Sequence, residues 1–264
     1  MARTSRALLP LLVAALVGTV IGVAVASSRE PRVVAARALP VAATAPAVVE
    51  GDWPSIGRIE PATVHPTSFL VADATVPRVE LFTAPDQPAG DGLDNPTWEG
   101  LDVVFLVLGR EGDWVNVRVS SRPNGRVAWV RAADVAFRRV PNWIRVEIAA
   151  KRLTVLHGDT PLMSTTVAVG KEATPTPVGS FFVDGIVPLD PPHPAYGAGQ
   201  VSVSGFSPTL SSFGGGVGQI ALHGTFATGL LGQETSNGCV RLDNDSIRRV
   251  IELAPTGTPV EILA

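Results

Sequence analysis

The chain contains only one cysteine in 264 residues, so Cys239 cannot form an intramolecular disulfide. Three of the four histidines, His65, His157 and His193, are scattered without the H-x-x-x-H or H-E-x-x-H spacing of a zinc site, and we interpret them as surface residues. Basic residues number 21 against 24 acidic ones, and this lack of basic excess argues against nucleic acid as a partner. The run Gly214-Gly215-Gly216 lacks the Lys-Ser/Thr of a phosphate-binding loop. We therefore expect no metal and no cofactor.

The N-terminal residues have the pattern of an export signal. Arg3 and Arg6 precede a run without charge from Ala7 to Ala26, which ends in an A-x-A match for signal peptidase. Because the run is also long enough to span a bilayer, residues 1–26 predict either a signal peptide or an N-terminal membrane anchor. No cysteine stands directly after the apolar run, which argues against a lipoprotein. Residues 27–66 read as an Ala/Pro-rich linker. We expect an exported protein of the cell envelope, secreted or anchored, that meets the membrane only through this segment.

The 26 glycines and 23 prolines favour a turn-rich, mainly β protein. Residues 67–137 contain short strand-like runs that predict a small barrel; they are Arg78–Phe82, Asp102–Leu108, Trp114–Val119 and Val127–Val130. Asn124-Gly125 predicts a tight hairpin turn, because both residues tolerate positive φ. The pattern around Trp114 and Trp129 resembles bacterial SH3-like domains. These two tryptophans either belong to the core or line a ligand groove.

Residues 142–264 predict further strands and one helix packed on them. The strands expected are Trp143–Ala149, Arg152–Leu156, Pro161–Gly170 and Pro259–Leu263. Ile247, Val250, Ile251 and Ala254 follow helical spacing, with Asn244 or Asp245 as the cap and Pro255 and Gly257 at the end.

The single cysteine lies in a polar turn. Cys239 ends the sequence Ser236-Asn237-Gly238-Cys239, and His223 lies upstream of it. A lone cysteine is usually a small buried apolar residue. Here the glycine-bearing turn, the nearby histidine and Arg241, which can stabilise a thiolate, favour a nucleophile with a base.

The segments His223-Gly224-Thr225 and Ser236-Asn237-Gly238-Cys239-Val240-Arg241 resemble the active-site signature of YkuD-type L,D-transpeptidases. Ala173–Gly179, Ser204–Pro208 and Gly218–Ile220 also fit this family, whereas Asn237 stands where many members have His. The resemblance implies a YkuD-type β-sandwich with one packed helix over residues 142–264, preceded by the SH3-like barrel.

The resemblance also implies a reaction on peptidoglycan stem peptides. Cys239 would attack the amide between the L-centre of a diamino acid and D-Ala, and His223 would transfer the proton. The Gly224 carbonyl would orient His223, and the N–H groups of Gly238 and Cys239 would stabilise the oxyanion. A thioester would form and pass to an acceptor amine. Carbapenems, which mimic the donor acyl group, would acylate Cys239.

Several residues are expected to contact substrate; they are Thr225, Ser236, Asn237, Arg241 and Tyr196. Three of them also have a structural alternative. Ser236 either lines the pocket or closes its own turn. Arg241 either binds a substrate carboxylate or pairs with a nearby acid. Tyr196 lies in a predicted long loop that is either a flap, with Gly214–Gly216 as its hinge, or plain surface.

Three functions stay open at this point. The first is a transpeptidase, and the second is an L,D-carboxypeptidase that resolves the same thioester with water. The third is a wall-binding protein in which the SH3-like domain acts and the C-terminal domain is inactive. The intact His-to-Cys motif argues against the third.

Overall fold

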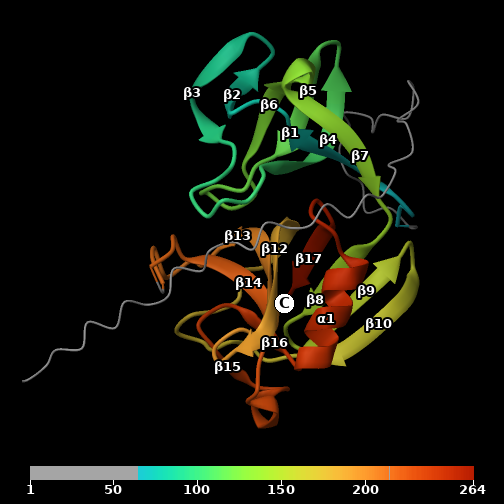
Figure 1. Ribbon diagram of the computed structural model, residues 1–264, viewed down its shortest axis with the longest axis vertical. Helices are drawn as coiled ribbons and strands as arrows, with labels where there is room; N and C mark the ends of the chain where they lie inside the picture. Colours follow the sequence, from blue (N-terminus) through green and yellow to red (C-terminus); the bar gives the residue numbers. More distant parts are fainter. Residues whose placement is uncertain (1–64, 214) are drawn as a thin grey trace, which may run out of the picture. The chain divides into compact units, whose positions relative to one another are not determined.

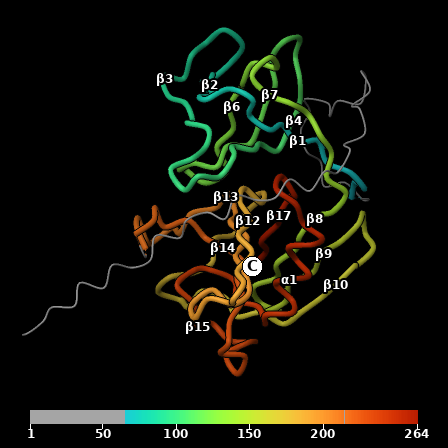
Figure 2. The backbone as a smooth tube through the Cα atoms, viewed as in Figure 1, coloured from blue at the N-terminus to red at the C-terminus, as the bar shows by residue number. Residues whose placement is uncertain are grey.

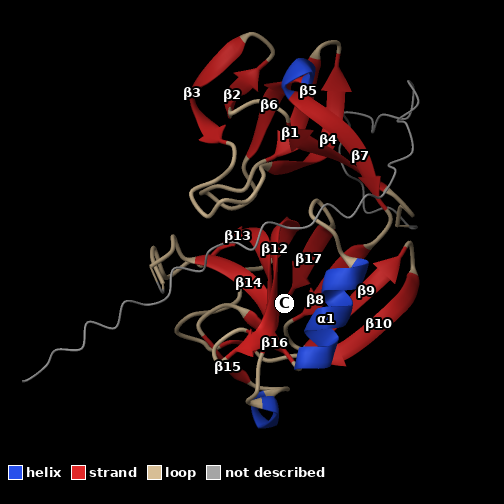
Figure 3. Cartoon of the chain, in the orientation of Figure 1, coloured by secondary structure: helices blue, strands red, loops and turns tan. Residues whose placement is uncertain are grey.

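Strands dominate the part of the chain that the computed structural model describes, residues 65–213 and 215–264 (Figure 3). The predicted signal or anchor and nearly all of the predicted linker lie outside these residues. Among the described residues, no helix combines the length and apolar character needed to cross a bilayer.

The first half of the described chain forms one seven-stranded antiparallel sheet, which we call the N-terminal sheet (Phe69–Val140; Figure 1). Its strand order is β3-β2-β6-β5-β4-β1-β7. The strands are β1 (Phe69–Ala74), β2 (Arg78–Ala84), β3 (Gln87–Asp94), β4 (Val104–Glu111), β5 (Trp114–Arg118), β6 (Val127–Arg131) and β7 (Val135–Val140). Alternation along the strands turns apolar side chains such as Leu81, Phe105 and Val117 into a core of their own.

The predicted turn at Asn124-Gly125 is present, because the Pro123 carbonyl accepts the Arg126 N–H at 3.2 Å and the pair lies at the centre of this turn. The whole connection is longer than the turn. Eight residues, 119–126, connect β5 to β6, and of the pair only Gly125 has a positive φ, at 80°. The side chain of Asn124 is used elsewhere, as described below. Strands β1, β3 and β7 were not predicted, because their apolar alternation is short or weak. The SH3-like identity of this sheet stays a prediction.

The two tryptophans of the N-terminal sheet are neither fully buried nor fully exposed. Trp114 packs edge-on against Phe82, with ring centroids 4.6 Å apart, and the Arg131 guanidinium lies over both rings. Trp129 lies opposite Phe82 in the β2–β6 pair. The core and groove alternatives therefore both remain open.

The second half, the C-terminal region (Trp143–Leu263), pairs eight strands in the order β10-β9-β8-β17-β12-β13-β14-β16, with a separate β11–β15 pair. Its strands are β8 (Trp143–Glu147), β9 (Arg152–His157), β10 (Thr160–Thr166), β11 (Val169–Gly170), β12 (Gly179–His193), β13 (Gly197–Phe206), β14 (Gln219–Gly224), β15 (Glu234–Ser236), β16 (Val240–Leu242) and β17 (Pro259–Leu263). The predicted single strand Pro161–Gly170 is in fact β10 and β11, interrupted at Val167-Ala168.

The long strand β12 joins two layers. Its first residues, Gly179–Phe182, pair with β17, and Val183–His193 pair with β13. Ile144 and Val155 from one layer share a single apolar cluster with Val203 and Leu222 from the other. The result is mainly β with one helix, consistent with a YkuD-type β-sandwich.

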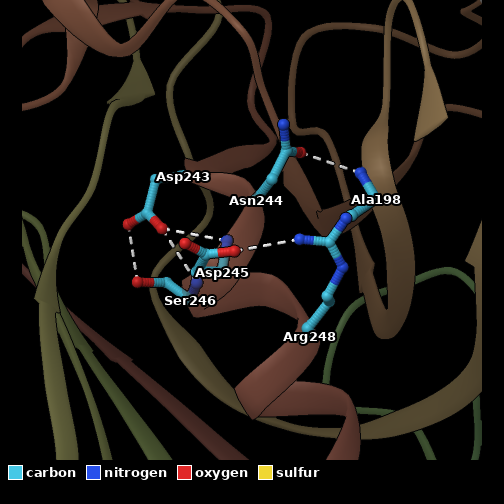
Figure 4. Close-up of polar contacts among 6 residues, drawn as sticks. All are labelled: Ala198, Asp243, Asn244, Asp245, Ser246 and Arg248. Carbon is cyan, nitrogen blue, oxygen red and sulfur yellow. Dashed lines mark hydrogen bonds and ion pairs between the residues drawn. The ribbon is translucent and has the colours of Figure 1, made fainter.

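The helix α1 (Asn244–Leu253) covers this cluster with Ile247 and Val250, as its spacing predicts. The predicted cap, Asn244 or Asp245, is wrong by one or two residues. Asp243 caps the helix, because its Oδ1 accepts the N–H groups of Asp245 and Ser246 at 3.1 and 2.9 Å (Figure 4). Asn244 instead binds the neighbouring sheet, since its Oδ1 accepts the Ala198 N–H at 2.8 Å (Figure 4).

Tyr196 does not lie in a long loop. It occupies the short connection between two long strands, β12 and β13, which pair as a hairpin. Of the prolines that suggested a loop, Pro192 falls where the pairing register of β12 shifts, and Pro194 lies in the connection itself. An irregular strand margin tolerates prolines, since no ladder N–H is needed there. Gly214, in the predicted hinge, lies outside the described residues.

The N-terminal sheet and the C-terminal region belong to one compact unit. Two residues connect β7 to β8, so the chain passes directly from one to the other (Figure 2). Val71, Val104 and Val140 of the sheet share a small apolar cluster with Phe182 of β12. The Arg138 guanidinium, paired with Asp73, also donates to the Thr256 hydroxyl at 2.9 Å.

Candidate active site

The turn before Cys239 is closed by one buried hydroxyl. Ser236 Oγ accepts the Gly238 N–H at 3.1 Å and donates to the Cys239 carbonyl at 2.5 Å. Gly238 has a φ of 117°, a conformation that a side chain rarely adopts. Ser236 therefore has the structural role in its own turn, and glycine is needed at 238 because of its backbone conformation.

The Thr-Pro segment holds the same turn from outside. Thr176 Oγ1 donates to the Gly238 carbonyl at 2.9 Å and accepts the Gly170 N–H at 2.8 Å. Thr174 Oγ1 donates to the Ser236 carbonyl at 3.3 Å and lies 3.5 Å from Asn237 Oδ1. These bonds stabilise the turn, because buried polar groups lose free energy when they are left without partners.

Cys239 lies beside the end of a strand that neighbours the strand of His223. Cys239 directly precedes β16, which runs parallel to β14 with Val240 opposite Leu222 and Arg241 opposite His223 (Figure 1). Since Leu222 and Val240 point into the core, His223 and Arg241 point to the other face of the sheet.

The histidine has one defined tautomer. His223 is buried, and its Nδ1 lies 2.8 Å from the Gly224 carbonyl oxygen. A carbonyl can only accept, so Nδ1 must carry the hydrogen and Nε2 is left with its lone pair. This is the arrangement that a proton acceptor needs.

Gly224 has no room for a side chain. A Cβ at this position would lie 2.5 Å from Asn244 Oδ1 and 2.9 Å from the Ala198 nitrogen. The start of α1 therefore presses directly against the residue whose carbonyl orients His223. Asn244 was predicted only as a cap, and its contact with Ala198 and Gly224 could not be read from the sequence.

Burial shifts the pKa values of Cys239 and His223 so that each group favours its neutral form. It raises the pKa of the Cys239 thiol above its usual value, although an Ala221 backbone contact and the Arg241 charge act in the opposite direction. Burial also lowers the pKa of His223, and Arg241 adds to this, while the bond to Gly224 opposes it. At neutral pH the site thus holds a neutral thiol beside a neutral imidazole, so Arg241 does not suffice to create a resting thiolate.

Two further predicted residues lie beside the histidine. Tyr196 packs edge-on against His223, with ring centroids 5.3 Å apart, and stacks with His193 at 5.3 Å. The Arg241 guanidinium makes no ion pair among the residues that the structure describes. Of its two predicted roles, pairing with a nearby acid is therefore not observed there.

Two groups with a predicted role in the reaction or in substrate binding take part in other hydrogen bonds. The Gly238 N–H, expected to stabilise an oxyanion, donates to Ser236 Oγ instead. The Thr225 hydroxyl, expected to contact substrate, accepts the Ala227 N–H at 3.1 Å and so closes a turn. Thr174 and Thr176, by contrast, hold the turn but were predicted only as parts of a matching segment.

Comparison with known proteins agrees with this site. Residues 141–262 match the family described as L,D-transpeptidase catalytic domain, YkuD. The YkuD protein of Bacillus subtilis is 31% identical over 123 residues, which cover 47% of this chain and 66% of that protein, just under two thirds of its length. The corresponding protein of Bacillus licheniformis is 29% identical over 123 residues, which again cover 47% of this chain and 66% of that protein.

Solved structures also resemble the chain. An L,D-transpeptidase from Mycobacterium smegmatis has 18% identity and a TM-score of 0.37, covering 57% of this chain and 91% of its own. L,D-transpeptidase 3 from Mycobacterium tuberculosis, solved with a faropenem-derived adduct, has 16% identity and a TM-score of 0.38, covering 52% and 73%. Both TM-scores lie below 0.5, so the assignment rests on the sequence matches. Those matches show that residues 141–262 are similar to the L,D-transpeptidase catalytic domain family.

Proposed function

We propose that the protein is an exported peptidoglycan L,D-transpeptidase with Cys239 as its nucleophile. The observation that carries this proposal is that the chain's single cysteine directly precedes β16, which pairs with the strand of a histidine whose Nδ1 is hydrogen-bonded to the Gly224 carbonyl. The free Nε2 is then available to take the thiol proton. The match of residues 141–262 to the L,D-transpeptidase catalytic domain family supports the same reaction class.

The reaction begins with neutral groups. Cys239 Sγ attacks the amide carbonyl carbon of the donor stem peptide, between the L-centre of the diamino acid and D-Ala, and His223 Nε2 takes the thiol proton. The resulting tetrahedral oxyanion is stabilised by the Cys239 N–H, since the Gly238 N–H already donates to Ser236. The C–N bond then breaks, and His223 returns the proton to the leaving D-Ala amine, leaving a thioester.

The second half repeats the steps in reverse. An acceptor amine attacks the thioester carbonyl and loses its proton to His223, and the thiolate leaves and regains a proton. Arg241, on the same face as His223, binds a substrate carboxylate, and Tyr196 covers the histidine from the β12–β13 hairpin. Residues 1–26 bring the enzyme to the cell envelope as a signal peptide or an anchor.

The test is product analysis with a disaccharide-tetrapeptide donor. We expect release of D-Ala and, with an added amine acceptor, a new amide-linked product. Release of D-Ala that yields only the hydrolysed tripeptide, with every amine tried, would make the protein an L,D-carboxypeptidase. Absence of any D-Ala release from a folded protein would contradict the proposal.

A further inference from the structure

One segment of the N-terminal sheet reaches into the C-terminal region with every second side chain. It runs from Arg118, the last residue of β5, to Asn124 in the connection to β6. Val119, between the first two of these side chains, is buried in the core of the N-terminal sheet. Arg118 ends a strand, whereas residues 120–125 form bends and turns, so the side chains of Arg122 and Asn124 extend from a turn.

Two of these side chains bind β12. Arg118 Nη1 donates to the Ser180 carbonyl at 2.9 Å. The Ser120 hydroxyl donates to the carboxylate of Asp184, and the same carboxylate oxygen accepts Gln219 Nε2 at 2.6 Å. Gln219 is the first residue of β14, so this contact links the N-terminal sheet to the strand that carries His223.

The amide of Asn124 acts on the end of β13 as a neighbouring strand would. Its Nδ2 donates to the Phe206 carbonyl at 2.8 Å, and its Oδ1 accepts the Phe206 N–H at 2.8 Å. Phe206 is the last residue of β13 and pairs with Gln219 of β14. Both hydrogen-bonding groups of this residue are therefore fixed by one side chain from the other half of the molecule.

The guanidinium of Arg122 holds the connection between β13 and β14. Nη1 donates to the Ser207 carbonyl at 2.9 Å, and Nη2 donates to the Leu210 and Val217 carbonyls at 2.8 and 3.2 Å. The group also lies over the Phe206 ring, 5.1 Å from its centroid. One planar cation thus gathers three carbonyls that span both ends of the connection, which a single ammonium could not do with the same geometry.

These contacts lead along one strand to the reacting groups. Gln219, Ala221 and His223 alternate on β14 and share one face. The Ala221 backbone contacts Cys239, as its effect on the thiol pKa shows. A shift of β14 at its first residue would therefore move both the base and a neighbour of the nucleophile.

We propose that Arg122 and Asn124 are positioning residues for the reaction, which fix the start of β14 and through it His223. The inference depends on the proposed function for its meaning in catalysis. It assigns the N-terminal sheet a part in assembling the active site.

The experiment compares Arg122→Ala and Asn124→Ala with a matched control, Arg126→Ala. Arg126 makes a bidentate ion pair with Asp91 inside the N-terminal sheet, at 2.7 Å for both bonds. Its replacement therefore controls for the loss of an arginine from the same connection. The two readouts are the rate of Cys239 acylation by a carbapenem and the pKa of His223, followed by NMR of labelled histidine. Thermal unfolding reports stability separately.

We expect acylation to fall about 10- to 100-fold in Arg122→Ala and Asn124→Ala, since small misplacements near reacting groups have effects of this size. We expect the pKa of His223 to rise towards that of an exposed histidine, because a loosened strand admits water. Arg122→Lys should stay low in rate, as its ammonium cannot serve three carbonyls. Arg126→Ala should change neither readout.

Unchanged acylation and an unchanged His223 pKa in Arg122→Ala would overturn the inference, as would equal effects in Arg126→Ala. Failure of the proposed function looks different, because the wild-type protein would then not be acylated at all. The NMR titration still decides the inference in that case, since it needs no reaction.

Discussion

The turn that carries Cys239 and the strand that carries His223 are held by different parts of the molecule. Ser236, Thr174 and Thr176 fix the turn, and all three lie in the C-terminal region. The strand β14 is pressed by Asn244 at its end and held through Arg122 and Asn124 at its start. The nucleophile is thus fixed from within one region, and the base from two.

The largest effect is expected at the nucleophile itself. Cys239→Ser should lower turnover by at least about 10³-fold, because a hydroxyl is far less acidic than a thiol and nucleophile replacements commonly have effects of this order or larger. D-Ala release measures turnover, and circular dichroism checks that the fold is retained. A variant that keeps most of its activity would refute the thiol mechanism for this site.

The next effect tests the end of β14. Gly224→Ala should slow acylation about 10- to 100-fold, because the added methyl meets Asn244 Oδ1 and Ala198 and displaces the carbonyl that orients His223. Gly229→Ala is the matched control, since a Cβ there meets no atom within 4 Å among the described residues. Equal acylation rates for the two variants would show that Gly224 does not position the histidine.

A stability effect is expected at the turn. Ser236→Ala removes a buried hydroxyl that both accepts and donates, so the free energy of unfolding should fall by about 1–3 kcal/mol. Urea unfolding measures this, with the exposed Ser212→Ala as the control. If both variants unfold at the same urea concentration, the turn does not depend on this hydroxyl.

The last effect depends on pH and concerns the contact between the two halves. Burial raises the pKa of Asp184 to about 6, with the charge of Glu99 adding to it and the bonds to Ser120 and Gln219 opposing it. The folded state therefore holds this proton more tightly than the unfolded state, whose value is near 3.8. The group's contribution to stability is present below that value and is lost as the pH rises through about 6.

The loss amounts to at most about 3 kcal/mol, from a pKa difference of about two units. Asp184→Asn removes the titrating group, so the stability difference between wild type and variant should change across this window. Urea unfolding at several pH values between roughly 4 and 7 measures it. A difference that stays constant with pH would show that Asp184 ionises normally.

The sequence predicts well those parts of the active site whose residues lie close together along the chain. The Ser236-x-Gly238-Cys239 turn, the upstream His223 and the α1 core residues are all set by spacing along the chain. The supports of β14 are different, because Arg122 and Asn124 lie about 100 residues before His223. Asn124-Gly125 forms the turn that its pattern predicts, and only the folded chain shows that the Asn124 side chain also pairs with Phe206.

Competition between neighbours explains the remaining errors. Asp243, Asn244 and Asp245 can each cap a helix, and the choice falls on Asp243 because Asn244 is used by Ala198. The prolines of β12 suggested a loop around Tyr196, yet β13 pairs with β12 on both sides of the irregular stretch.

The most direct test of the account is intact-mass analysis of the purified protein after incubation with a carbapenem, followed by peptide mapping. We expect a single covalent adduct on the Cys239 peptide, and we expect Cys239→Ala to form none. Absence of an adduct on a protein shown to be folded, or an adduct that persists in Cys239→Ala, would contradict the assignment of Cys239 as an accessible nucleophile.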